Sequence, residues 1–460
     1  MVKNPLGEEK VLNLLVKFSV PAIVGMTVNA LYNIVDRIFI GNSSDLGSNG
    51  IAGITVAFPL MNILMAIAIL FGVGGATLFS LRLGQRRPEE AEEAMGNAFV
   101  LLVGVGILFM IVGQIYLEQL LILFGASETI LPYSMEYMRI IFCGAVFQIV
   151  SMGMNHFIRA DGSPKIAMLT MFLGAGTNIV LDPIFIYGFR MGMAGAALAT
   201  ILAQLLSAIW VVSYFLGKKS TNKLILKHLK LKFKVARTIA TLGIPGFLLQ
   251  LANSLLNITL NKNLFLYGGD IAVSAMGVIY SIQTIFFMPV IGIRQGVQPI
   301  ISFNFGAEKY ERVKEATKLA TIGATGFVTL GFIFTHLFPE FLIGLFNREP
   351  ELLRVGSAGL KAWFLCMPLV GFQIVGSTLF QAIGKAGIAT FLTLSRQMII
   401  LLPAIIFFPR LWGVVGIYYA APFSDFLSAL LTWIFYSYCL KNLTQEPSRP
   451  ATKDILTETE

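Results

Sequence analysis

Long apolar stretches alternate with short polar segments along almost the whole chain. A helix needs about 20 predominantly apolar residues to cross the roughly 30 Å hydrocarbon core of a bilayer. Dividing the chain at its charged clusters and turn signals gives twelve such stretches, and each is predicted to be a membrane-spanning helix. The predicted spans cover residues 13–40, 51–80, 94–116, 132–157, 165–188, 191–216, 238–266, 272–303, 319–338, 355–382, 386–408 and 412–439. The pattern predicts an all-α polytopic membrane protein.

The second half of the chain repeats the first. The segment GQRRPEEAEEAMGNA, which begins at Gly84, aligns with GAEKYERVKEATKLA, which begins at Gly306, at an offset of 222 residues. FIRADG aligns with LFQAIG and GMAG with GVVG at nearly the same offset, and Pro21 aligns with Pro245. Six spans therefore repeat as six spans, which keeps both copies in the same membrane orientation. Parallel repeats of this kind are a transporter architecture.

The repeat predicts two pseudo-symmetric six-helix bundles. We expect an N-terminal lobe over residues 1–217, a basic cytoplasmic linker over 218–237 and a C-terminal lobe over 238–440. The polar tail, residues 441–460, is predicted to be disordered.

The composition supports a chain that is solvated by lipid. Apolar residues make up 56% of the 460 residues and charged residues only 13%, and the mean hydropathy is +0.77. A soluble chain has about 45–50% apolar and about 25% charged residues. So much apolar surface does not fit inside one water-soluble core. The three Cys and three His have no metal-ligand spacing, so no disulfide framework or His-based metal centre is expected.

The basic residues predict the orientation of the chain. With the N-terminus inside, the inner segments hold 24 Lys and Arg and the outer loops hold 4. This positive-inside bias places both termini in the cytoplasm. The linker sequence KKSTNKLILKHLKLKFKVAR has the spacing of an amphipathic helix on anionic lipid, which we favour over binding to nucleic acid.

Two carboxylates lie deep in the spans of the first half. Ionisable groups within a span are energetically costly, at least about 2.5 kcal/mol, and are functional candidates by default. Asp36 shares one stripe of the first helix with Asn29 and Asn33, at positions i+7, i and i+4. Asp182 in the fifth helix follows Asn178 by one turn and precedes Pro183, which frees a backbone carbonyl nearby.

Further oxygen-bearing side chains come from neighbouring helices. Thr200 lies in the sixth helix and Asn155 near the end of the fourth. Carboxylate, amide and hydroxyl oxygens suit a proton or a hard cation such as Na⁺. Two carboxylates that share one dry site cannot both stay ionised without a counterion, so they would hold a proton or Na⁺ between them. The alternative is a structural network of interhelical hydrogen bonds.

The second half has different chemistry. Leu260 aligns with Asp36, and the segment that aligns with Asp182 contains no acid. The seventh helix nevertheless carries a polar stripe that is a candidate cavity lining. Its members are Gln250, Asn253, Asn257 and Asn261. Asp425 in the twelfth helix is the deep acid of this half, and both substrate binding and a structural ion pair fit it.

Arg294 lies in the middle of the eighth span and is a further cavity candidate. A guanidinium stays charged in proteins, so its burial needs a partner. We expect Asp36 or Asp182 to be that partner in one conformation. The other basic residues within spans, among them Arg396, fit side chains that reach towards the interface from helix ends.

These segments resemble the multidrug and toxic compound extrusion (MATE) family. The resemblance covers about residues 8–440 and rests on NALYNIVDRIFIG, RADGSPKIAM, TNIVLDPIFIYG, GMAGAALAT and QGVQPIISFNFGAEKYERVKEA, in that order. It is strongest to the prokaryotic DinF- and MepA-type members. NorM-type members place acids in the seventh and tenth helices, where this chain has Asn253 and Val370.

The resemblance implies a set of site residues and a function. The coupling cation would be held by four first-half residues, with Asn155 as a less certain fifth: Asp36, Asn178, Asp182 and Thr200. The protein would be a secondary antiporter in a prokaryotic plasma membrane that exports lipophilic and cationic compounds in exchange for H⁺ or Na⁺.

The sequence contains no G-x-x-x-x-G-K-[ST] loop, so we expect no nucleotide, no catalytic activity and no cofactor beyond the coupling ion. The alternatives are a lipid-linked precursor flippase of the related superfamily and, from another class, a channel or a membrane receptor.

Overall fold

The computed structural model describes residues 5–41, 43, 46–346 and 348–443. Within helices, the backbone but not the side chain is described for Asn33, Ile34, Arg37, Gly41, Gly47, Ser48 and Asn442. Most of the predicted disordered tail, residues 444–460, lies outside the described part.

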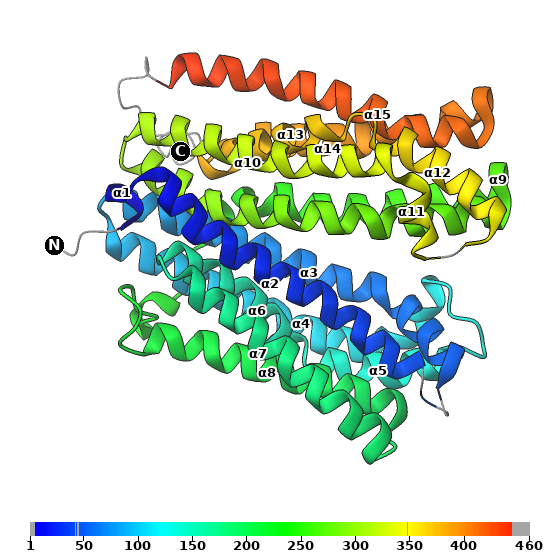
Figure 1. Cartoon of the computed structure of the whole chain (residues 1–460). Helices are drawn as coiled ribbons and strands as arrows, with labels where there is room; N and C mark the ends of the chain where they lie inside the picture. Colours follow the sequence, from blue (N-terminus) through cyan, green and yellow to red (C-terminus); the bar gives the residue numbers. More distant parts are fainter. Residues whose placement is uncertain (1–4, 42, 44–45, 347, 444–460) are drawn as a thin grey trace. The chain divides into compact units, whose positions relative to one another are not determined.

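All regular secondary structure in the described residues is helical (Figure 1). The α-helices are α1 Pro5–Glu8, α2 Val11–Gly41, α3 Gly47–Gly84, α4 Pro88–Leu123, α5 Leu131–Cys143, α6 Ala145–Ala160, α7 Pro164–Pro183, α8 Gly192–Leu216, α9 Phe233–Gly306, α10 Tyr310–Leu337, α11 Pro339–Gly344, α12 Pro350–Phe364, α13 Met367–Ala382, α14 Ala386–Leu394 and α15 Leu402–Asn442. Two π-helical turns, η1 Ile184–Gly188 and η3 Ser395–Leu401, and one 3₁₀ turn, η2 Leu226–Leu229, complete them.

The described helices account for twelve membrane passes. Eight are long and apolar enough to cross a bilayer, and the bent pairs α5–α6 (58°) and α12–α13 (45°) bring the number to ten. Helix α9 has 74 residues, which would extend about 110 Å as one straight helix. Its backbone breaks at Gly269, and the run Ala386–Lys441, which joins α14, η3 and α15, breaks at Trp412 and Gly413, so each of these two runs supplies two passes. The predicted fold class is therefore confirmed.

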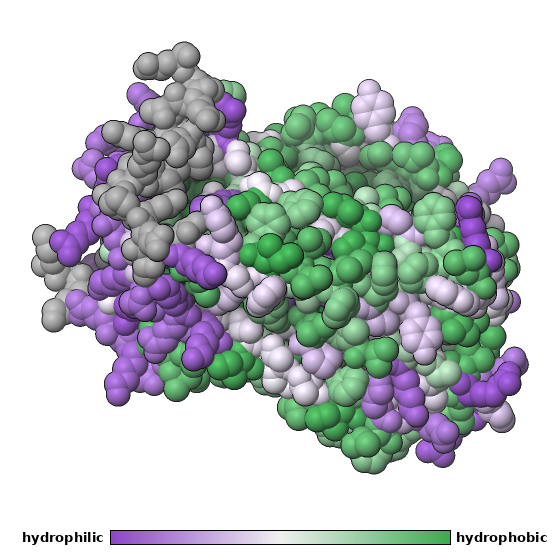
Figure 2. Space-filling model, turned by 90° about the horizontal axis from the view of Figure 1, so that it is seen from above, coloured by the Kyte–Doolittle hydropathy of each residue, from purple (hydrophilic) through white to green (hydrophobic). Residues whose placement is uncertain are grey.

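Apolar side chains cover much of the molecular face shown in Figure 2. Large residues such as Ile285 and Phe265 are 66% and 61% exposed. A water-soluble surface does not carry apolar side chains at this density, whereas spans in lipid do.

The sequence repeat is also a repeat of backbone geometry. Positive φ angles occur at aligned positions of the two halves. These pairs are Arg86 and Glu308 (62° and 58°), Gly162 and Gly384 (91° and 86°), and Gly192 and Gly413 (56° and 58°). At Gly162 and Gly384 the left-handed conformation ends the preceding helix directly before the next one begins, which is the usual use of glycine in this position.

The chain forms two compact units, which are described separately. The first unit comprises Met1–Pro5 and Val24–Phe247, and the second comprises Leu6–Ile23 and Leu248–Glu460. These bounds differ from the predicted lobes at two places. The first part of α2 belongs to the second unit, and the first part of α9 belongs to the first unit.

Each of these two helix segments packs closely against a glycine of the unit to which it belongs. In the second unit, a Cβ on Gly296 would lie 2.7 Å from the backbone nitrogen of Ser19. In the first unit, a Cβ on Gly74 would lie 2.8 Å from the backbone nitrogen of Gly243. Gly74 aligns with Gly296 and Gly243 with Ser19, so the repeat preserves this crossing. Small residues let helix backbones approach in membranes, where the hydrophobic effect does not hold helices together.

The linker does not form the predicted amphipathic helix. Only the four residues of η2 are helical, and α9 begins at Phe233. The backbone N–H of Lys223 donates to Glu92 of α4 at 2.7 Å, and that of Lys232 donates to Asn97 at 2.7 Å. Glu92 and Asn97 of α4 thus take up backbone groups that a helix would have bonded internally.

Asp161, between α6 and α7, anchors the start of the linker. Its carboxylate accepts hydrogen bonds from Tyr214 (2.7 Å), Ser220 (2.8 Å) and Asn222 (2.7 Å) and from the backbone N–H of Thr221 (3.3 Å). One acid therefore holds four donors around the end of α8, three of them from the consecutive residues 220–222.

The glycine crossing in the first unit is testable by adding one methyl group. Gly243→Ala would place a Cβ 2.8 Å from the Cα of Leu70, a backbone atom that cannot rotate away. We expect a loss of about 1–3 kcal/mol and a thermal midpoint in detergent several degrees lower. Gly104→Ala in α4 is the matched control, because nothing lies within 4 Å of its added Cβ. Alanine is the better helix former, so the control midpoint should stay or rise. Equal midpoints for both variants would contradict the close crossing.

The anchoring role of Asp161 predicts how proteases attack the linker. Asp161→Ala removes hydrogen bonds to a charged acceptor, each worth about 1.5–3 kcal/mol, so the linker should open at least about tenfold more often. We expect trypsin to cut between residues 218 and 234 correspondingly faster in purified protein. Glu89→Ala, an exposed acid at the start of α4, should leave the cleavage rate unchanged. A cleavage rate in Asp161→Ala equal to that of the wild type would show that other contacts hold the linker.

Candidate functional site

Helices α7 and α8 bring three predicted residues together in the first unit. Asn178 and Asp182 lie one turn apart on α7 and are 1% and 0% exposed. The amide nitrogen of Asn178 donates to Asp182 Oδ1 at 3.3 Å and to the hydroxyl oxygen of Thr200 on α8 at 3.3 Å. Pro183 and the π-helical turn η1 follow directly, so Asp182 lies where the regular hydrogen bonding of the span ends.

Asp36 completes this cluster from α2. The side chain is buried, and it hydrogen-bonds the side chain of Asp182. A hydrogen bond between two carboxyl groups requires a proton on one of them, because an ionised carboxylate only accepts. The two predicted acids therefore meet in the first unit, an arrangement that favours a proton on one of them.

The cluster is rich in acceptors. Asp182 has Asp36 and Asn178 as its described partners, and neither carries a positive charge. Two of its buried oxygens, Asp182 Oδ2 and Asn178 Oδ1, accept no hydrogen bond from any described residue. An unsatisfied buried oxygen costs about 1–3 kcal/mol. Oxygens in excess of donors are the arrangement that a proton or a hard cation relieves.

Two tyrosines belong to the cluster and were missed by the sequence analysis. Tyr32 is close enough to interact electrostatically with Asp36 and Asp182, and Tyr137 of α5 hydrogen-bonds Thr200. Tyr32 lies one turn before Asp36, so the helical stripe could have included it. Tyr137 is in another helix and has no spacing relation to either acid.

The remaining first-half candidates are Asn155, Asn29 and Asn33. Asn155 donates to the backbone carbonyl of Ala167 at 2.9 Å and accepts from Arg159 at 2.6 Å, so these hydrogen bonds do not reach the acids. Asn29 lies two turns before Asp36 on α2 and is partly exposed. The side chain of Asn33 is outside the described part of the structure.

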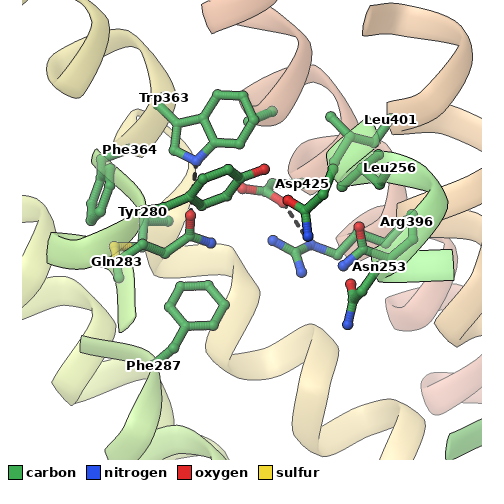
Figure 3. Close-up of a pocket in the computed structure, with 14 residues that line it drawn as sticks. Asn253, Leu256, Tyr280, Gln283, Phe287, Trp363, Phe364, Arg396, Leu401 and Asp425 are labelled. Carbon is green, nitrogen blue, oxygen red and sulfur yellow. Dashed lines mark hydrogen bonds and ion pairs between the residues drawn. The ribbon is translucent and has the colours of Figure 1, made fainter. Parts of the chain in front are cut away.

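In the second unit, Asn253 and Asn257 line a pocket together with Asp425 (Figure 3). Asp425 pairs with Arg396, whose Nε donates to Asp425 Oδ1 at 2.7 Å. Arg396 is thus a pocket residue, and its interpretation as an interface anchor was wrong, because its guanidinium pairs with Asp425 of α15. Gln250 does not line this pocket.

Arg294 belongs to the second unit. Its predicted partners are Asp36 and Asp182, and both belong to the first unit. The pairing of Arg294 with either acid therefore stays a prediction.

A six-pass bundle that is repeated in parallel and contains a buried acid pair is typical of secondary transporters. The family model MatE matches residues 21–184 and residues 245–406, one match in each half of the chain. The protein belongs to the MatE family, and the resemblance based on the motifs is confirmed.

Curated relatives and solved structures match over nearly the full chain. The multidrug export protein MepA of Staphylococcus aureus (strain NCTC 8325 / PS 47) is 27% identical over 433 residues, 94% of each chain. MepA of Staphylococcus haemolyticus (strain JCSC1435) is 26% identical over 435 residues, 95% of each chain. An outward-facing multidrug resistance MATE family transporter of the MOP superfamily has the same fold, with a TM-score of 0.90, 24% identity and coverage of 97% of this chain and 99% of its own.

The hydrogen bonds separate the two candidate asparagines. Asn178→Ala removes an amide that bonds both Asp182 and Thr200, so the ion concentration needed for half-maximal transport should rise at least about tenfold, or about 1.4 kcal/mol. Asn155→Ala serves as the matched variant. It should lower thermal stability, because Arg159 loses an acceptor, but leave the ion dependence in place. An unchanged ion dependence in Asn178→Ala at normal expression would remove this residue from the site.

Proposed function

We propose that this protein exports small lipophilic and cationic compounds by antiport with H⁺ or Na⁺. The observation that carries the proposal is the hydrogen-bonded pair of Asp36 and Asp182, buried in the first unit with no described cationic partner for Asp182. A pair of this kind has two useful charge states. It is neutral enough to stay buried when it holds an ion, and it is repelled or hydrated when it does not.

The coupling follows from the difference between these states. An ion moves a conformational equilibrium only if it binds one conformation more tightly than the other. We infer that the ion binds tightly where Asp36 and Asp182 lie together and weakly where they separate or meet water. Asn178 and Thr200 contribute the further oxygens, and Na⁺ would use the same set as a proton.

The relatives support the choice of substrate. Their names describe multidrug export, and we extend that activity to this chain as part of the proposal. We further propose that the chain has no catalytic activity and no cofactor beyond the coupling ion, because its function needs only binding and conformational change. The excess of inner basic residues supports both termini in the cytoplasm and insertion in a prokaryotic plasma membrane.

The acid pair is tested in vesicles that contain the purified protein. Asp36→Asn and Asp182→Asn keep the side-chain shape and remove the charge, so export of a fluorescent lipophilic cation driven by an imposed pH or Na⁺ gradient should fall at least about tenfold, equivalent to about 1.4 kcal/mol of lost ion binding. Asp270→Asn makes the same change at an exposed position of α9 and should transport normally.

The same vesicles separate the alternatives. Full export by both single variants at wild-type protein levels would refute the proposed ion site. Passage of the dye without any gradient would indicate a channel, and movement of a labelled lipid-linked precursor in place of the dye would indicate a flippase.

A further inference from the structure

The pocket of the second unit has the size of a single aromatic ring. Its volume is about 120 Å³, and its lining comes from both passes of α9 and from α12, α13, η3 and α15. An apolar cavity of about 150 Å³ is known to hold benzene. The space is therefore suited to one ring with small polar substituents, rather than to a large multicyclic compound.

One side of the pocket is an aromatic wall. Trp363 and Tyr280 meet edge to face, with ring centroids 6.0 Å apart, and the indole N–H of Trp363 donates to Gln283 at 3.0 Å. Phe287 and Phe364 continue the wall (Figure 3). The hydrogen bond and the ring contact fix the orientation of Trp363, so a ring that enters the pocket meets a preformed apolar surface.

The guanidinium of Arg396 lies in the middle of this lining, between Asp425 and the ring of Phe287 (Figure 3). It uses Nε for its single hydrogen bond to Asp425. Within the described chain, its two terminal nitrogens, Nη1 and Nη2, have no hydrogen-bond partner. Two parallel N–H groups at the end of a guanidinium are the geometry that binds a carboxylate through both of its oxygens.

The pocket also contains hydrogen-bond acceptors that have no donor. The buried oxygens Gln397 Oε1 and Tyr280 Oη have no hydrogen-bond partner among the described residues. An amide oxygen only accepts, so Gln397 needs a donor to enter the pocket. Asp425 keeps a second oxygen, Oδ2, that receives no hydrogen bond from the described residues. A group with several N–H donors, such as an ammonium, would satisfy these acceptors together.

The charge balance selects the ligand class. Arg396 and Asp425 cancel each other, so the pocket is neutral as it stands. A simple cation would meet the guanidinium, and a simple anion would leave a net negative charge in a site of low dielectric. A zwitterion adds one charge of each sign and keeps the balance.

We propose that this pocket binds a small single-ring aromatic zwitterion. Its carboxylate lies on the free edge of Arg396, its ammonium lies against Asp425 and Gln397, and its ring packs on Trp363 and Phe287. The site deepens the proposed function by adding a substrate class, and it uses none of the first-unit acids. Failure of ligand binding here is therefore distinguishable from failure of ion coupling there.

The ligand class is tested on the purified full chain in detergent with three probes that share one ring. L-Phenylalanine carries both charges, N-acetyl-L-phenylalanine keeps only the carboxylate, and 2-phenylethylamine keeps only the ammonium. Binding is measured by calorimetry and by tryptophan fluorescence. Trp363 is 5% exposed, whereas Trp210, Trp412 and Trp433 are at least 38% exposed, so only Trp363 reports on the pocket.

We expect L-phenylalanine to bind at least about tenfold more tightly than either single-charge probe, because each loses one charge-assisted contact. The fluorescence change should vanish in Trp363→Phe, because none of the other three tryptophans lines the pocket. Binding of both single-charge probes as tight as that of L-phenylalanine, or no binding of L-phenylalanine, would overturn the proposal.

The role of the guanidinium is tested by a change that keeps its charge. Arg396→Lys removes the two-pronged edge and should weaken binding of L-phenylalanine at least about tenfold. Arg410→Lys is the matched control, an exposed arginine of α15 outside the pocket, and should bind as the wild type does. Unchanged affinity in Arg396→Lys would place the carboxylate elsewhere. If this variant does not fold, the order of the three probes on the wild-type protein still decides the ligand class.

Discussion

The hydrocarbon core of a membrane offers no partner to a charge, and this constraint governs the surroundings of the deep acids Asp36, Asp182 and Asp425. The protein meets it in two ways. In the first unit, Asp36 and Asp182 lie against each other, so that a shared proton or a bound cation would lower the charge of the pair. In the second unit, Asp425 is neutralised by Arg396 at 2.7 Å. Under the proposed function, the charge of the first pair depends on a bound ion and so responds to an ion gradient, whereas Asp425 has its counter-charge in Arg396.

The acid pair of the first unit and the ion pair of the second unit are built on two copies of the same backbone repeat. The two halves share three aligned pairs of positive φ angles and one close helix crossing, so the scaffold repeats at these points. What differs is the set of polar side chains within each unit. Duplication of a six-span unit thus supplies two similar frames, and substitution inside the frames divides the chemistry. The acid cluster suits ion coupling, and the neutral pocket with its aromatic wall suits the recognition of an organic ligand.

The sequence predicted the spans, the repeat and both first-unit acids because each follows from a local pattern. Apolar length defines a span, and Asn178 and Asp182 are one turn apart on one helix. Contacts between helices have no such pattern. Tyr137 reaches Thr200 from another helix, and Arg396 meets Asp425 across 29 residues of chain, so neither was found. The linker was misread for a related reason. Its spacing fits an amphipathic helix, but Glu92 and Asn97 of α4 compete for its backbone groups, and that competition is tertiary.

The exchange of helix segments gives the two prolines of the repeat a physical role. The division between the units falls two residues after Pro21 in α2 and two residues after Pro245 in α9. Proline lacks the N–H that would bond the preceding turn, so a helix is weakest there. Each helix that belongs to both units therefore has its weak point where it passes from one to the other.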